Sequence, residues 1–266
     1  MKNRNSAYIQ FISMSFQTTF IYRYNVIFQV LGVLFQIYLL KTVWISVYLQ
    51  KNNTSHMNLN TLICYLTLAN LQTWLLTPTI TDTLQQRIRT GDIALDIAKP
   101  VHFIGQLSSQ QLGSTLSLLP FLFLAFPLAL LVGGMQLPAS LQSTILYIIS
   151  LLLAYLITSF IGLLMGLISF WTFEITGIQF IYRFVNQLFS GALIPLWLFP
   201  PIIHTFANFL PFQAVAFLPV SIYLGQLQGI DLLYAFLIQL FWAMILYLLV
   251  QLVWHRAKHY VMVQGG

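Results

Sequence analysis

Residues that could carry catalysis or bind a metal are few in this sequence and lie far apart. His255 and His259 are four residues apart on a predicted helix, a spacing that can bind a metal, but no third ligand stands near them. There is no Gly-Lys dipeptide, so the phosphate-binding loop of ATP-hydrolysing proteins is missing. Asp231 directly precedes apolar residues and is predicted to cap a helix. We therefore predict no catalytic, metal or cofactor-binding residue in this chain.

Neutral amides are the other polar groups inside the apolar stretches. Gln29 and Gln36 lie on one helical face of the first stretch, while Asn186 and Gln187 lie together in a later one. These side chains could line a path for the polar part of a cargo, or they could bond neighbouring helices. No Asp or Glu lies near the centre of an apolar stretch, where proton and sodium pathways usually need one.

The composition shows which solvent surrounds these residues. Of the 266 residues, 59% are hydrophobic and 6% are charged, against about 25% charged in an average globular protein. Too few polar residues remain to cover a soluble surface, which excludes a soluble enzyme, a secreted protein and a disordered chain. The single cysteine excludes a disulfide framework. Basic residues sit at the ends of apolar runs, which is typical of membrane orientation signals and not of nucleic-acid binding.

Spacing of the charges predicts an all-α membrane protein with six transmembrane helices in a single domain over 1–266. No charged residue occurs between Pro100 and Phe173, a stretch long enough for two spans of about 20 residues each. A loop at 133–138 separates these two spans. The other spans are predicted at 24–48, 60–80, 177–196 and 230–254.

Basic residues predict the orientation of these spans. Nine of them fall on the side of the two termini, and Lys41 and Lys51 fall toward the other side. We therefore expect both termini to be cytoplasmic, with residues 50–58, 133–140 and 197–228 outside. The polar residues that interrupt the start argue against a cleaved signal peptide.

Two segments are not predicted to be plain spans. Residues 5–22 place Ser6, Gln10, Ser13 and Gln17 on one helical face, which predicts an amphipathic helix in the membrane interface; a longer, tilted first span is the alternative. Residues 195–225 contain five prolines among apolar side chains, which no single straight helix accommodates. We expect short re-entrant helices there, between the fifth and sixth spans.

The cytoplasmic stretch 82–99 concentrates charge. It can begin a short helix at a Thr or Asp cap and end it at Gly91, or it can be an ordinary charged loop that orients the chain. Glu174, in the next cytoplasmic turn, could pair with Arg183 or face water. Gly162 and Gly166 form a small-xxx-small pair that lets another helix approach, in this chain or in a second one.

In their order, these features resemble the permease subunits of type-2 ABC exporters, in the small six-span branch. The resemblance covers the whole chain and rests on three strings, namely Arg89–Pro100, Phe170-Trp171 and the proline-rich run that begins at Ser190-Gly191. It implies a dimer of two permeases, identical or sister subunits, in a bacterial plasma membrane. It also implies separate ABC ATPase subunits, which bind ATP and magnesium and drive the export of an apolar or amphipathic cargo.

The resemblance also turns the charged stretch into an expected coupling helix on the ATPase. Leu84 and Ile88 share one face and are expected to fill an apolar pocket there, while Arg87 and Arg89 reach acids around it. Gly91 ends the helix and Asp92 caps the next turn. The alternatives are a membrane-embedded transferase or protease, which would need clustered catalytic groups, and a passive channel or scaffold subunit.

Overall fold

The computed structural model describes residues 4–50, 58–172 and 174–264, and these fold into helices joined by short connections. In chain order the elements are α1 (Arg4–Ile21), α2 (Arg23–Gln50), α3 (Leu59–Leu75), α4 (Ile80–Thr90), α5 (Ile93–Ile97), α6 (Phe103–Gly133), α7 (Leu141–Thr172), α8 (Thr176–Phe189), η1 (Leu196–Leu198), α9 (Pro201–Asn208), η2 (Pro211–Ala214), α10 (Phe217–Tyr223) and α11 (Gly229–Gln264).

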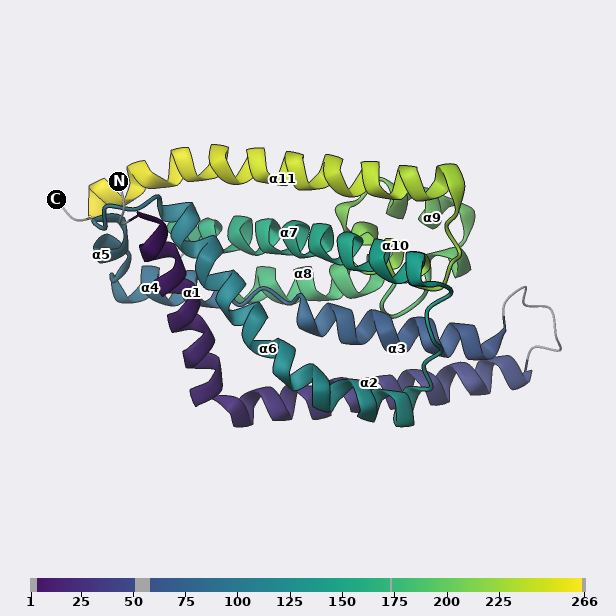
Figure 1. Ribbon diagram of the computed structural model, residues 1–266. Helices are drawn as coiled ribbons and strands as arrows, with labels where there is room; N and C mark the ends of the chain where they lie inside the picture. Colours follow the sequence, from purple (N-terminus) through teal and green to yellow (C-terminus); the bar gives the residue numbers. More distant parts are fainter. Residues whose placement is uncertain (1–3, 51–57, 173, 265–266) are drawn as a thin grey trace.

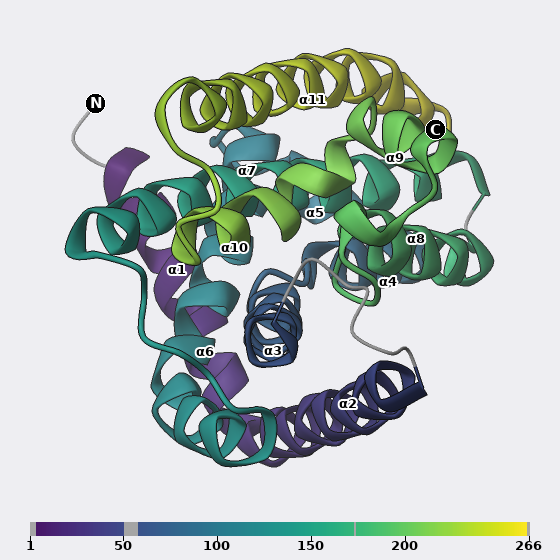
Figure 2. The ribbon, with the colours of Figure 1, turned by 90° about the vertical axis from the view of Figure 1, so that its right-hand side faces the viewer.

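The long helices share one direction. Figure 1 shows α2, α3, α6, α7, α8 and α11 running along it, with α4, α5, the beginning of α1 and the end of α11 at one end of the bundle. α9 lies at the opposite end. Viewed along the bundle in Figure 2, α3 lies near the centre, surrounded by the others. Most of the side chains of α3 are accordingly buried.

Four of the described helices are long and apolar enough to cross a membrane, namely Arg23–Leu49, Phe103–Gly133, Leu141–Thr172 and Gly229–Lys258. The pair Pro201–Asn208 and Pro211–Tyr223, bent by 73°, would make a fifth if it is one broken span. The predicted all-α membrane fold is confirmed. Two spans also fill the charge-free stretch, and the break between them falls at Gly134, whose φ of 84° suits glycine.

Two predicted spans are shorter than expected. The stretch predicted at 60–80 contains the 17-residue α3, and the stretch at 177–196 contains the 14-residue α8. Pro78 follows α3 closely, and a proline disfavours helix at the residue before it. After α8 comes Gly191, whose φ is 84°, so the backbone leaves the helix there.

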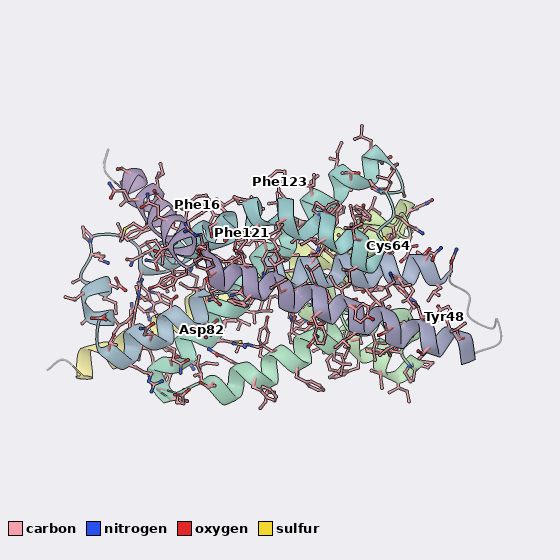
Figure 3. All side chains as sticks on the ribbon, turned by 90° about the horizontal axis from the view of Figure 1, so that it is seen from below. Phe16, Tyr48, Cys64, Asp82, Phe121 and Phe123 are labelled. Atoms are coloured by element: carbon pink, nitrogen blue, oxygen red, sulfur yellow. The ribbon has the colours of Figure 1, made fainter. Side chains whose placement is uncertain are left out.

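α1 and α2 are separate helices, so the alternative of one longer first span is wrong. They break at Tyr22, and α1 runs steeply across the bundle in Figure 1. A Cβ on Gly113 of α6 would lie 2.3 Å from the carbonyl oxygen of Ile12, so α1 and α6 are in close contact. Figure 3 shows Phe16 and Phe121 near this crossing, and Phe121 packs against Phe20 with ring centroids 5.6 Å apart.

Outside the long helices, the backbone of the proline-rich segment is irregular, as its sequence predicts. η1, α9, η2 and α10 are short, and the chain bends sharply between α9 and the segment Pro211–Tyr223. Three amides from the long helices donate to its free carbonyl oxygens: Asn70 to Ala192 (3.0 Å), Gln72 to Val215 (2.5 Å) and Gln239 to Ala214 (2.9 Å). Non-helical backbone at membrane depth persists only when its polar groups are satisfied by protein. These amides therefore have a structural role.

Two of the described helices begin at a residue whose side chain caps them. Asn58 caps α3 by accepting from the N–H of Asn60 (3.1 Å), and His102 caps α6 by accepting from the N–H of Gly105 (3.3 Å). The expectation that Asp231 caps the last span is wrong, because α11 begins at Gly229 and Asp231 lies inside its first turn. Its carboxylate still complements the helix dipole there.

Candidate functional site

A cavity of about 840 Å³ lies between α2, α3 and α8. All four amides predicted as candidate pathway residues line it: Gln29 and Gln36 from α2, and Asn186 and Gln187 from α8. The two amide pairs are far apart in sequence, and the fold brings them to the walls of one cavity. The structure therefore assembles the predicted set.

Helical periodicity explains how each wall of the cavity forms. On α8 the lining residues are one turn apart and share one face; they are Gln179, Tyr182, Arg183, Asn186 and Gln187. The lining residues of α2 form a second such stripe; they are Asn25, Val26, Gln29, Gly32, Val33 and Gln36. Because the stripes mix amides with small and apolar groups, the cavity suits a molecule with both polar and apolar parts.

Gln29 and Gly32 differ in how they contribute to the wall of α2. The indole N–H of Trp74 donates to Oε1 of Gln29 at 3.3 Å, which links α3 to α2 beside the cavity. A Cβ added at Gly32 would meet no described atom within 4 Å. Gly32 therefore leaves open space in the wall rather than a close helix contact.

Two charged residues line the cavity among the residues described. Asp82, labelled in Figure 3, lies in the first turn of α4 and accepts from Nε2 of Gln179 at 2.9 Å. Arg183 lies one turn further along α8 and forms no ion pair within the described chain. The expected alternative that Glu174 pairs with Arg183 is therefore wrong.

α4 is the helix predicted in the charged cytoplasmic stretch. It extends over Ile80–Thr90 and ends at Gly91, whose φ of 80° is left-handed, as the sequence predicts. Asp92 occupies the cap position before α5, but its side chain makes no cap bond; it accepts from the hydroxyl of Thr90 at 2.6 Å instead. The stretch is thus an ordered helix and not a loop.

The apolar face of α4 is turned inward, which corrects the predicted docking residues. Leu84 and Ile88 share one face, but their exposed fractions are 0% and 7%, and they pack in a core with Leu163 and Leu167 of α7. Because this chain covers both side chains, neither is free to fill a pocket on a partner. Burial of the apolar face against the chain's own helices stabilises α4 instead.

The two glycines predicted for helix packing make room for this contact. A Cβ on Gly162 would lie 2.4 Å from Cβ of Pro78, and one on Gly166 would lie 3.0 Å from Cδ2 of Leu84. The hydroxyl of Thr81 donates to the carbonyl oxygen of Gly162 at 2.9 Å. Gly162 and Gly166 therefore pack α7 against α4 and the turn before it, within one chain.

Arg87 is held inside the chain rather than reaching outward. Its guanidinium lies 2.6 Å from Asp96 of α5, which also accepts from Lys99 (2.6 Å) and Gln106 (3.1 Å). Burial raises the pKa of the Asp96 carboxyl, but the hydrogen bonds from Lys99 and Gln106 and the charge of Arg87 outweigh it and lower the pKa overall. Asp96 thus joins α4, α5 and α6. Sequence reasoning missed this role, although both basic partners, Arg87 and Lys99, stand within nine positions of Asp96.

Arg89 remains exposed and has a partner within the chain. Its guanidinium donates to Oε2 of Glu174 at 3.0 Å, and Oε1 of Glu174 accepts from Gln85 at 2.9 Å. The hydroxyl and backbone N–H of Thr176 also donate to Glu174. Thr176, Gln85 and Arg89 together lower the pKa of Glu174 to about 2.

A second exposed feature, on α5 next to α4, was not predicted from the sequence. Leu95 of α5 is 70% exposed, and the exposed residues Thr90, Gly91 and Asp92 come shortly before it in the chain. Its neighbours Ile93 and Ile97 are four apart and turn toward the core, so the same helical spacing would have placed Leu95 on the outer face. We call Arg89, Thr90, Gly91, Asp92 and Leu95 the α4–α5 surface.

The possible metal pair of His255 and His259 lies partly outside the described residues, because these do not include the side chain of His259. Most of the predicted outer loop 50–58 likewise lies outside them.

Comparison with known proteins agrees with a membrane protein built of apolar helices. The sequence profile of the family described as ABC-2 family transporter protein matches residues 31–262. No curated protein matches the chain. Proteins of this family are membrane subunits of ABC transporters and work with a separate ABC ATPase subunit. Because the match spans nearly all of the sequence, the chain belongs to the ABC-2 transporter family.

Proposed function

We propose that this chain is the permease of an ATP-driven exporter that moves an apolar or amphipathic cargo out of the cell across a bacterial plasma membrane. The carrying observation is the 840 Å³ cavity, whose walls combine amides with apolar residues. ATP and magnesium bind to the partner ATPase, since no phosphate-binding loop occurs in this sequence.

We further propose six crossings with both termini in the cytoplasm. α3 and α8 run in the same direction as the long helices in Figure 1, and the irregular segment after α8 extends its path. The beginning of α1 and the end of α11 lie at the end that holds α4 and α5. The spacing of the spans in the sequence assigns nine basic residues to the side of the termini and two to the other side, which favours the cytoplasm for the side of the termini.

A second permease, identical or a sister subunit, completes the cavity in this proposal. Gln29, Gly32 and Arg183 line the cavity and are exposed, so the cavity is open on one side. Polar groups that face lipid are costly. A protein surface is the covering that would satisfy them, with lipid around the remaining apolar faces.

The α4–α5 surface is the proposed docking site for the ATPase. Leu95 supplies an exposed apolar side chain, and Arg89 and Asp92 supply charges around it. Contact there would move α4, and the Arg89–Glu174 and Asp82–Gln179 bonds would carry this motion to α8 and the cavity.

Purification of the complex tests the function. We expect an ATPase with a phosphate-binding loop to co-purify with the chain, and the reconstituted pair to hydrolyse ATP and move amphiphiles in liposomes. The isolated chain should neither bind nor hydrolyse ATP. Transport without any ATPase would instead indicate a passive channel, and covalent modification of lipid or peptide by the isolated chain would indicate a membrane enzyme.

Labelling of single cysteines in intact cells tests the orientation. In a Cys64→Ser background, Leu137→Cys should react with an impermeant reagent from outside, and Leu95→Cys should react only after permeabilisation. Both positions are exposed, at 91% and 70%, so a difference would report the side of the membrane. The reverse pattern would contradict the proposed topology.

A further inference from the structure

We propose that Arg183 is the receptor for an anionic headgroup, so that the cargo of this cavity is an amphiphile that carries a phosphate or carboxylate. This inference extends the proposed function, and it depends on that function for treating the bound amphiphile as transported cargo. It depends on the placement of one cation in a wall whose other groups are nearly all neutral.

The surroundings of Arg183 are what distinguish it from other basic residues. Arg87 and Lys99 both pair with Asp96, and Arg89 pairs with Glu174. Arg183 lines the cavity on the same face of α8 as Gln179 and Asn186, and within the described chain no carboxylate lies within 4 Å of its guanidinium. A guanidinium can donate two parallel hydrogen bonds to a phosphate or carboxylate, which gives geometric as well as electrostatic selectivity.

Asp82, the other charged residue of the lining, does not cancel this preference. Its carboxylate accepts from Gln179 at 2.9 Å and lies in the first turn of α4, where the helix dipole favours a negative charge. It also borders a separate groove of about 280 Å³ with Gln86 and Arg89. Asp82 therefore lies at the boundary between the cavity and that groove. Arg183 lies one helical turn beyond Gln179, the α8 residue that donates to Asp82.

Asn186 adds a second polar requirement. It lies three residues after Arg183 on the lining face and is 9% exposed, and its side-chain oxygen is buried without a partner among the described residues. A buried acceptor without a donor is costly, so a hydroxyl or N–H near the anionic group of the cargo would satisfy it. Apolar lining residues such as Val26, Val33 and Met165 are available to an alkyl part.

Binding to the purified full-length chain in phosphatidylcholine nanodiscs tests the inference without any ATPase. The probes are monododecyl phosphate, dodecyl maltoside and inorganic phosphate, and the signal is tryptophan fluorescence, since Trp74 lines the cavity. Trp74→Phe should lose the response. We expect saturable binding of monododecyl phosphate, much weaker binding of dodecyl maltoside, and little binding of inorganic phosphate.

Variants of two arginines identify the group responsible. Arg183→Ala should weaken binding of monododecyl phosphate about tenfold or more, the loss expected for a charge-assisted hydrogen bond, and Arg183→Lys should lose less. Arg23→Ala is the matched control, because its guanidinium lies 5.4 Å from the Tyr24 ring centroid and outside the cavity lining. It removes the same charge and should bind as the wild type does.

Three results would overturn the inference. They are unchanged affinity in folded Arg183→Ala, equal binding of the phosphate and maltoside amphiphiles, and binding of inorganic phosphate as tight as that of monododecyl phosphate, which would assign the site to a soluble anion. If the chain binds the anionic amphiphile through Arg183 but recruits no ATPase, the binding site is supported and the proposed transport function is refuted.

Discussion

The guanidinium of Arg89 lies 3.0 Å from the Glu174 carboxylate, which ties the end of α4 to the residues just before α8. Both side chains are more than half exposed, at 59% and 54%. An exposed ion pair contributes little to stability, because water screens the two charges. In the proposed mechanism the pair has a different role, because it links Arg89 of the α4–α5 surface to the residues just before α8.

Glu174→Gln is expected to weaken coupling with little effect on folding. It keeps the size of the side chain and removes the charge that holds Arg89. Cargo-stimulated ATP hydrolysis by the assembled transporter should fall several-fold, while Tm changes by less than about 4 °C. Asp231→Asn, at the opposite end of the bundle, is the control. Full stimulation in Glu174→Gln would show that the link is not used.

The effect of Glu174 on coupling should not vary with pH in the neutral range. Its folded pKa of about 2 lies below the ordinary glutamate value, because Thr176, Gln85 and Arg89 favour the charged carboxylate. A depressed folded pKa means that the contribution is fully present above the ordinary value and is lost only as the pH falls toward 2. The ratio of wild-type to Glu174→Gln activity should therefore stay constant between about pH 5 and 8. A titration midpoint of this activity ratio within that pH range would contradict the prediction.

Leu95→Asp should release the ATPase from a folded permease. Leu95 is 70% exposed, so the substitution adds a charge to a solvated site and removes an apolar contact of about 1.5–3 kcal/mol with a partner. Co-purification of the ATPase measures the loss. Leu137→Asp, at a 91% exposed site in the turn between α6 and α7, should retain the partner. Equal retention by both variants would refute the docking surface.

Ile88→Asp should behave differently, because it places an unpaired charge in the core under α4. The cost of burying a charge is several kcal/mol, so the chain should lose thermal stability before any specific loss of docking is seen. Melting followed by circular dichroism separates this effect from that of Leu95→Asp.

Gly162 and Gly32 should respond in opposite ways to the same substitution. Gly162→Ala forces a Cβ to within 2.4 Å of Pro78 and should destabilise the chain by about 1–3 kcal/mol. Gly32→Ala meets open space and should leave the stability unchanged or raise it by about 0.5–1 kcal/mol, as alanine favours helix. Gly32→Leu should fold normally but reduce amphiphile binding, because it fills part of the cavity. Denaturation and the nanodisc binding assay measure the two effects.

Gln239→Leu should loosen the irregular segment that follows α8. The Gln239 amide donates to the carbonyl oxygens of Ala214 and Ser150, and its loss leaves buried acceptors unsatisfied at about 1–3 kcal/mol. Hydrogen exchange of residues 211–223 should increase together with a lower Tm. Gln228→Leu, at an exposed position, is the matched control. Equal exchange in both variants would show that the amide is dispensable there.

The sequence by itself determined the features that depend on composition and on near neighbours. Six per cent charged residues cannot cover a soluble surface, so the membrane class followed directly. Gly91 could be predicted to end α4, and the amides of α2 and α8 could be placed on helical faces, because these properties arise within a few turns of one helix.

Only the tertiary structure decided which surfaces and charges meet. The periodicity of α4 shows that Leu84 and Ile88 form an apolar face that must be buried. It does not say whether a partner protein or α7 buries that face. In the structure α7 buries it, because Gly166 lets α7 approach Leu84 closely. The pairing of Arg89 with Glu174 rather than Arg183 with Glu174 likewise depends on where helices distant in sequence pack. Charge attraction acts over a few ångströms in space, and the spacing of residues along a chain does not contain that distance.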